Sequence, residues 1–248
     1  MKAKTIDEVI EALDLIIEDA KKTNNSKGYF AALYRKVTKR VKEGIAAGEF
    51  EDGERMERLD VLFANRYLNA YDNYFEGQTT TKSWTVAFDH TKQYWPIVLQ
   101  HLLWGMNAHI NLDLGIAAAA VAPGDSIHSL KKDFDRINAL LASLVGEVEQ
   151  ELSEIWPTLK YILTLSQKID DFLVNFSMKA ARDGAWRFAL KLAAAAEEER
   201  WKLIKDRDET IKEIANCVDP PGFIPRLVFA LIRLGEKRDI AKVIEILE

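Results

Sequence analysis

The fold of this chain is decided by residues 97–122, which read IVLQHLLWGMNAHINLDLGIAAAAVA. The stretch contains no Lys, Arg or Glu, and Asp113 is its one charged residue. We therefore expect a helix that is buried nearly all round. Its length would also span a bilayer, but several polar side chains interrupt it, so a buried helix of a soluble protein is the better interpretation.

Four residues recur at four-residue intervals in this stretch: His101, Gly105, His109 and Asp113. Because four residues turn a helix by only about 40° beyond a full turn, the four positions form one ridge along a single face. Buried polar groups need partners inside the protein, so the ridge is the first place to look for a functional site. Gly105 leaves a notch in the ridge where a ligand or another helix could approach the backbone.

Composition is that of an ordinary soluble protein. The chain has 248 residues, of which 48% are hydrophobic and 29% charged, enough to bury a large core. A net charge of −5 argues against a nucleic-acid surface. Cys217 is the one cysteine, so no internal disulfide can form, and the N-terminus has the pattern of an amphipathic helix rather than of a signal peptide. We expect a cytoplasmic protein without a transmembrane segment.

Helical periodicity runs through the whole chain, and no stretch alternates apolar and polar residues as a strand would. We predict an all-α, multi-helix bundle whose buried central helix lies near residues 96–121. The strongest boundary is Pro-Pro-Gly at 220–222, which separates a bundle domain, 1–219, from a C-terminal helical hairpin, 220–248, packed on it. The predicted helices span residues 5–22, 28–46, 53–76, 80–93, 96–121, 126–153, 157–182, 185–216, 224–234 and 237–247.

Two of these segments carry further expectations. The helix predicted at 185–216 begins with an apolar, alanine-rich half, which could bury against a second subunit in a homodimer or lie inside the monomer. The C-terminal stretch 227–247 is amphipathic and is predicted to cap the bundle; the alternative is association with a membrane surface.

The ridge itself suggests a catalytic site. A histidine and a carboxylate at positions i and i+4 point the same way, so His109 and Asp113 could hydrogen-bond each other or share a metal ion. His101 lies about 12 Å earlier along the axis, too far to join them directly unless the helix is distorted. The residues that we assign to catalysis are His101, His109 and Asp113.

Side chains of other helices are candidate partners of Asp113. Arg66 or Arg182 could neutralise its carboxylate or hold an anionic substrate. Asp133 lies on the helix that follows the central helix after a short connection, so the two helices are antiparallel neighbours and Asp133 could lie level with Asp113. Together with His109 and Asp113 it would complete a site for one divalent metal ion.

Asn107 lies about 160° around the helix from His109. It is assigned to substrate binding together with Arg66 and Arg182. Alternatively, Asn107 and Asn111 satisfy a second helix interface.

Several segments of the chain resemble a family of uncharacterised bacterial proteins, classed as a domain of unknown function. In chain order they read GEFEDGERMERLDVLFANRYLNAY, SWTVAFD, HLLWGMNAHINLDLGIAAA, DFDRIN and AARDGAW, within about residues 45–195. The resemblance implies no established activity, only positions of interest. These are Arg66, Tyr67, Trp84, His101, Asn107, His109, Asp113, Asp133, Asn138 and Arg182. The N-terminal helix and the residues after Pro220 fall outside the resemblance.

Two functions remain open. The first is an enzyme with a buried His/Asp site that hydrolyses a small molecule, with either a metal-activated water or a His–Asp general base. The alternative is a non-catalytic helical protein that binds a ligand or partner and whose polar ridge is structural. The substitution Asp113→Asn would abolish activity in the first case and mainly lower stability in the second.

Overall fold

The computed structural model describes residues 2–156, 178–219 and 222–248. Within these ranges the regular elements are all helical and no strand is present, which confirms the predicted all-α bundle. Along the chain the helices are α1 (Ile6–Thr23), α2 (Lys27–Ala46), α3 (Gly53–Phe75), α4 (Lys82–His90), α5 (Val98–Ala108), the π-helix η1 (His109–Asp113), α6 (Leu114–Val121), the 3-10 helix η2 (Gly124–Leu130), α7 (Lys131–Ile155), α10 (Met178–Ala194), α11 (Glu197–Asn216), α12 (Phe223–Gly235) and α13 (Ile240–Leu247).

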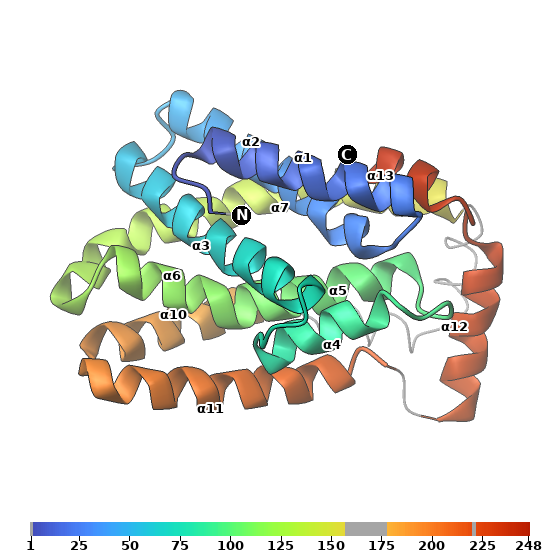
Figure 1. The fold of residues 1–248 in the computed structure, drawn as a ribbon. Coiled ribbons are helices and arrows are strands. Elements are labelled where there is room, and N and C mark those ends of the chain that lie inside the picture. Colours follow the sequence, from blue (N-terminus) through green and yellow to red (C-terminus); the bar gives the residue numbers. More distant parts are fainter. Residues whose placement is uncertain (1, 157–177, 220–221) are drawn as a thin grey trace.

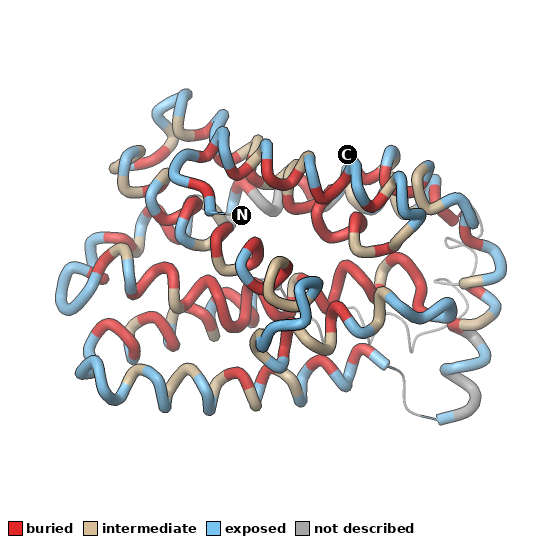
Figure 2. Tube along the Cα trace, in the orientation of Figure 1, coloured by how far each residue is buried: buried red, intermediate tan, exposed pale blue. Residues whose placement is uncertain are grey.

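The central helix, formed by α5, η1 and α6, lies between two groups of helices (Figure 1). Helices α2 and α3 contact it from one side, and α10 and α11 contact it from the other. Between Ile97 and Ala119 every residue is buried except Leu99, Met106 and Ile116, which are half-buried. The prediction of a central helix buried nearly all round is therefore confirmed, and Figure 2 shows this helix as an almost continuous buried segment.

A π-helical turn interrupts the central helix at His109–Asp113. There the backbone N–H of Leu114 donates to the carbonyl oxygen of His109, a step of five residues instead of four. All five residues of the turn are buried. The sequence predicted one regular helix here. The π-helical turn changes the geometry of the ridge at His109 and Asp113, the two residues of the predicted His/Asp pair.

The predicted boundaries of two late helices are wrong. Helix α10 continues through Asp183 and Gly184, where a break was expected, and the chain turns back at Ala195 and Ala196 instead. No glycine or proline marks this turn. The Nε of Arg200 donates to the carbonyl oxygens of Leu192 and Ala195, both at 3.1 Å, and so satisfies groups that the end of α10 leaves free. Most of the predicted helix 157–182 lies outside the described residues.

The alanine-rich face considered for a dimer is buried inside the chain, because α10 packs along α6. Ala185, Phe188, Ala189 and Leu192 are buried in this contact. Gly115 of α6 makes room for it, since a Cβ at that position would lie 2.7 Å from the ring of Phe188.

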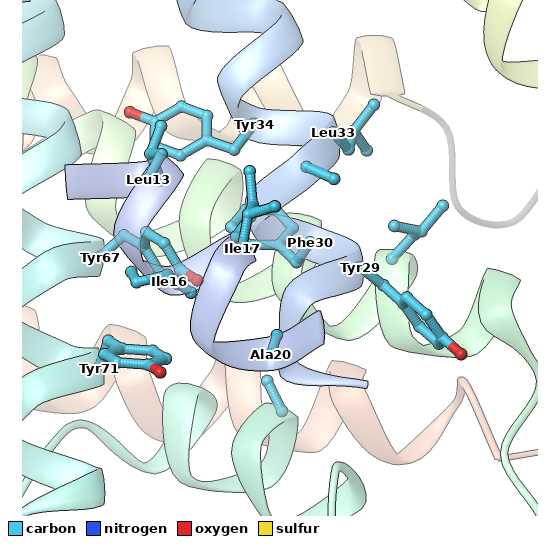
Figure 3. Close-up of a cluster of buried hydrophobic side chains, with 14 of the residues drawn as sticks. Leu13, Ile16, Ile17, Ala20, Tyr29, Phe30, Leu33, Tyr34, Tyr67 and Tyr71 are labelled. Atoms are coloured by element: carbon cyan, nitrogen blue, oxygen red, sulfur yellow. The ribbon is translucent and has the colours of Figure 1, made fainter. Parts of the chain in front are cut away.

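Helix α13 caps the bundle as predicted for the C-terminal stretch. Val243, Ile244 and Leu247 are fully buried and join the hydrophobic cluster of α1 and α2, part of which is drawn in Figure 3. Gly28 of α2 admits Ile244, whose Cδ1 lies 2.6 Å from where a Cβ would stand. The division into domains 1–219 and 220–248 stays a prediction. In the described part of the chain, no helix combines the length and apolar character needed to cross a membrane.

Candidate functional site

Asp113 is the one charged residue of the ridge, and it has no exposed surface. Its Oδ1 accepts a hydrogen bond from Nε of Arg66 in α3 at 3.0 Å, and its Oδ2 accepts one from Nε1 of Trp84 in α4 at 2.7 Å. A buried carboxylate costs several kcal/mol unless it is paired, so these bonds account for its position. Of the two arginines suggested as its partner, the structure selects Arg66.

His109 lies beside Asp113 in an aromatic environment. Its ring stacks on Phe63 with centroids 3.5 Å apart and planes 6° apart, and the ring of Tyr34 is 4.4 Å away. Nδ1 of His109 is 3.5 Å from Oδ2 of Asp113, without the alignment of a hydrogen bond. Both ring nitrogens are buried and have no hydrogen-bond partner among the described residues.

Burial controls the protonation state of this group. It lowers the pKa of His109, and the neighbouring Asp113 only partly opposes this shift, so the imidazole is neutral near pH 7. Burial raises the pKa values of Tyr34 and Tyr67 well above 10, so both hydroxyls stay protonated. These hydroxyls are buried without a partner in the described part of the chain, and Figure 3 shows both tyrosines within the buried cluster.

Arg66 and Phe63 form the edge of the group that is nearest to solvent. The side chain of Arg66 is 35% exposed, whereas that of Asp113 has no exposure. Phe63 is half-buried and covers one face of the His109 ring. Of the described side chains that contact His109 or Asp113, these two are the ones that are not buried.

The notch at Gly105 is filled by the protein itself. A Cβ at Gly105 would lie 2.4 Å from the ring of Phe30 in α2, so the glycine serves a close crossing of two helices. The same Phe30 ring contacts His109 and Trp84, at centroid distances of 5.7 Å and 5.6 Å. Beside Gly105 lies a cavity of about 20 Å³, also lined by Phe30, Trp84 and His101. That volume accommodates about one water molecule.

His101 is not part of the His109–Asp113 group. Its ring makes edge contacts with Tyr29 and Trp104, at 5.6 Å and 5.8 Å, and no hydrogen bond or ring contact between described residues joins it to His109. Burial lowers the pKa of His101 to about 3, so it is a neutral core side chain at physiological pH. The geometry supports the expectation that it is too far along the helix to share the site.

Asn107 serves a helix interface. Its Nδ2 donates to the carbonyl oxygen of Ile211 in α11 at 2.9 Å, and its Oδ1 accepts from Nδ2 of Asn111 at 3.0 Å. These contacts agree with the alternative in which Asn107 and Asn111 satisfy a second helix interface. Little of the Asn107 amide is left to bind a substrate.

Arg182 lies in α10, which packs against the π-helical turn. It is 8% exposed, and burial lowers its pKa to about 10. No hydrogen bond or ion pair connects it to Asp113 in the described part of the structure, so the structure does not bring Arg182 into the Asp113 group.

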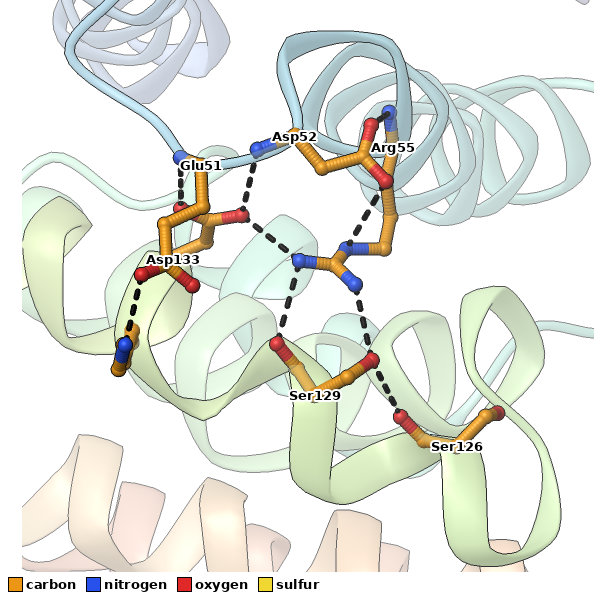
Figure 4. Close-up of polar contacts among 7 residues, drawn as sticks. Glu51, Asp52, Arg55, Ser126, Ser129 and Asp133 are labelled. Carbon is orange, nitrogen blue, oxygen red and sulfur yellow. Dashed lines mark hydrogen bonds and ion pairs between the residues drawn. The ribbon is translucent and has the colours of Figure 1, made fainter.

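The predicted metal site of His109, Asp113 and Asp133 is not formed. Figure 4 shows that Asp133 instead binds the start of α3: it accepts from the backbone N–H groups of Glu51 at 2.7 Å and Asp52 at 3.2 Å, and from Nη2 of Arg55 at 2.8 Å. Arg55 also donates to the side chain of Ser129 at 2.9 Å. Among the residues that the structure describes, no three His, Cys, Asp or Glu side chains are placed to hold a metal ion.

Two side chains of the group, Tyr34 and Phe63, were not predicted from the sequence, and neither was the role of Trp84. Trp84 stands in the SWTVAFD segment, so the resemblance marked its position but not its hydrogen bond to Asp113. Tyr34 and Phe63 follow ordinary core spacing on α2 and α3, and nothing in the sequence separates them from other core aromatics.

Comparison with protein families identifies the chain. The model of a family of unknown function, DUF5995, matches residues 6–221, so the chain belongs to this family. The match confirms the resemblance and is wider than the motifs suggested, because it includes the N-terminal helix. Searches of curated proteins and of solved structures gave no significant match for this chain.

Proposed function

We propose that the chain is an enzyme in which His109 acts as a general base for the hydrolysis of a small anionic substrate. One observation supports this most strongly: a neutral histidine is buried beside a carboxylate with both ring nitrogens unpartnered among the described residues. Buried polar groups without partners are rare and require an explanation. The π-helical turn adds support, because such turns are frequent at functional sites.

Asp113 and Tyr34, two neighbours of His109, have roles in this proposal. His109 Nε2 takes a proton from the water that attacks the ester or amide carbonyl, and Asp113 stabilises the resulting imidazolium, as the carboxylate does in other His–Asp pairs. The imidazolium then gives this proton to the alcohol or amine that leaves when the carbonyl–oxygen or carbonyl–nitrogen bond breaks. The Tyr34 hydroxyl is a donor for the oxygen on which negative charge develops. Because the lowered pKa keeps His109 unprotonated at neutral pH, the base is ready to accept a proton.

Arg66 gives the substrate its charge preference. It uses Nε for Asp113, and no described residue accepts a hydrogen bond from its two terminal nitrogens. These nitrogens are available for a carboxylate or another planar anion in the bidentate geometry that arginine favours. Phe63 must rotate away from the His109 ring for a substrate to enter, which makes it the gate of the site.

The test uses carboxylate-bearing p-nitrophenyl esters and anilides of increasing size. His109→Gln is expected to lower kcat/KM by about 10²-fold or more, as loss of a general base does. The control His128→Gln changes an exposed histidine and should leave turnover unchanged. Wild-type turnover by His109→Gln would refute the assignment of the base.

A second candidate is the non-catalytic protein with a structural ridge. The observation in its favour is that Phe30 fills the notch at Gly105 and leaves a cavity of about 20 Å³. The two functions differ in a measurement that needs no turnover: the ¹⁵N chemical shifts of His109 during titration with benzoate. Binding beside Arg66 would move these shifts, and a purely structural ridge would leave them unchanged.

A further inference from the structure

Helix α12 crosses one end of the molecule, between the end of α11 and the start of α13 (Figure 1). Its outer side is exposed in Figure 2. Three leucines on this side are exposed to an unusual degree: Leu227 by 47%, Leu231 by 56% and Leu234 by 49%. Scattered exposed leucines are common, but three on successive turns of one helix form an apolar stripe.

The stripe points away from the protein. At about 100° per residue, the centre of the three leucines lies about 160° around α12 from its buried residues, Phe229 and Ile232. Helix α12 and the residue after it are joined to the described bundle by the hydrogen bonds of Arg233 to Tyr94 and of Val98 to Glu236, so the leucines are not needed for that contact. Their exposure is a property of the folded chain.

Two more exposed apolar side chains lie in the loop before α5, which contacts α12 beside the leucine stripe. Tyr94 is 53% exposed and Trp95 58% exposed. Arg233 of α12 holds their loop in place: its Nε donates to the carbonyl oxygen of Tyr94 at 2.7 Å, and its guanidinium lies 5.0 Å from the Tyr94 ring centre. Trp95 and Arg226 line the same groove, of about 360 Å³, between this loop and α12. We call Leu227, Leu231, Leu234, Tyr94 and Trp95 the α12 apolar surface.

Basic residues surround this surface although the chain as a whole is acidic. Arg226, Lys237 and Arg238 are exposed at the two ends of α12. Of the nearby acids, Asp219 and Asp239 are exposed, and Glu236 is buried and accepts from the backbone N–H of Val98 at 3.0 Å. The three exposed basic residues therefore face two exposed acids, one of which, Asp239, caps the start of α13. Apolar residues, tyrosine and tryptophan flanked by Lys and Arg are the composition that binds the interface of an anionic membrane.

We infer that the α12 apolar surface binds peripherally to an anionic lipid bilayer. The leucines and Trp95 enter the boundary between headgroups and acyl chains, and Arg226, Lys237 and Arg238 contact the lipid phosphates. This inference is independent of the His109 site, and it concerns attachment to a membrane surface rather than crossing.

The test is flotation of the full chain with vesicles. Binding to vesicles of phosphatidylcholine with about 30% phosphatidylglycerol is expected, with much weaker binding to pure phosphatidylcholine and a loss of binding in high salt. The variant Leu227→Gln/Leu231→Gln/Leu234→Gln should reduce the partition coefficient by about tenfold or more, since it removes most of the inserted apolar area. Arg226→Gln/Lys237→Gln/Arg238→Gln should remove the preference for anionic lipid.

A matched control changes exposed leucines elsewhere. Leu15→Gln/Leu62→Gln alters side chains that are 66% and 40% exposed on α1 and α3, and it should float like the wild type. Equal flotation of the leucine-stripe variant, or no flotation of the wild type, would overturn the inference. It would also be overturned if light scattering showed a wild-type dimer that the stripe variant converts to a monomer, because the surface would then join two copies of the chain.

Discussion

Asp113→Asn tests whether one buried carboxylate holds the central helix to α3 and α4. The substitution keeps the volume of the side chain but leaves one acceptor oxygen where there were two. Either Arg66 or Trp84 then faces an amide nitrogen that cannot accept its hydrogen bond. A hydrogen bond to a buried charge contributes about 1.5–3 kcal/mol.

Two effects reduce the loss of stability that Asp113→Asn causes. The neutral amide of the variant would not carry the desolvation penalty of a buried charge. Arg66, which is 35% exposed, can turn toward water when its partner is lost. We therefore expect the free energy of unfolding to fall by about 2 kcal/mol, which for a domain of this size lowers the Tm by about 4–8 °C.

Urea unfolding followed by far-UV circular dichroism measures this change. Asp135→Asn is the control, because Asp135 is exposed and pairs with Lys131 one turn earlier on α7; its effect should stay below about 0.5 kcal/mol. A cycle with Trp84→Phe should show coupling of more than about 0.5 kcal/mol between the two positions. If Asp113→Asn unfolds like the wild type, the carboxylate does not bridge these helices and the reasoning fails.

Two further predictions concern buried titratable groups. Burial, with a smaller contribution from the charge of Glu57, raises the pKa of Asp60 from 3.8 to about 7, so its contribution to stability is present below pH 4 and is lost as the pH rises toward 7. Asp60→Asn removes this pH-dependent loss. The unfolding free energy of the variant minus that of the wild type should therefore be about 2–4 kcal/mol larger at pH 8 than at pH 4.5, measured by urea unfolding. The same difference at both pH values would contradict the prediction. His109→Phe replaces unpartnered ring nitrogens next to Phe63 and should leave the unfolding free energy unchanged or raise it by up to about 1 kcal/mol; a loss above about 2 kcal/mol in the same assay would mean that His109 has a structural bond.

Helix starts were predictable where local chemistry sets them. Thr5 caps α1 by accepting from the backbone N–H of Glu8, and Asp52 caps α3 by accepting from that of Arg55. The predicted and observed starts agree within one residue at both helices. The turn at Ala195 and Ala196 has no capping residue of this kind in the local sequence. The carbonyl oxygens of Leu192 and Ala195 accept instead from the side chain of Arg200. That contact exists only after α11 has folded back.

The candidate site, too, could be predicted from the sequence only in part. A carboxylate in an otherwise uncharged helix must be paired, so the sequence alone predicts a cationic partner for Asp113. The choice between Arg66 and Arg182 depends on how far neighbouring helices are rotated about their axes, which local sequence does not determine. The metal site failed for this reason: Asp133 was placed at a suitable height, but its carboxylate faces the start of α3.

His109 and Asp113, the first and last residues of the π-helical turn, differ in their contacts. Asp113 uses both of its oxygens for α3 and α4, and His109 receives only a contact of 3.5 Å. The hydrogen bonds from Asp113 to α3 and α4 therefore do not involve His109, whose ring nitrogens make no hydrogen bond in the described part of the chain. A neutral histidine kept in such a position costs stability relative to an apolar side chain. Retaining it is reasonable for a protein that uses the ring for chemistry, and this is why His109 rather than the whole ridge is the residue on which the proposed function depends.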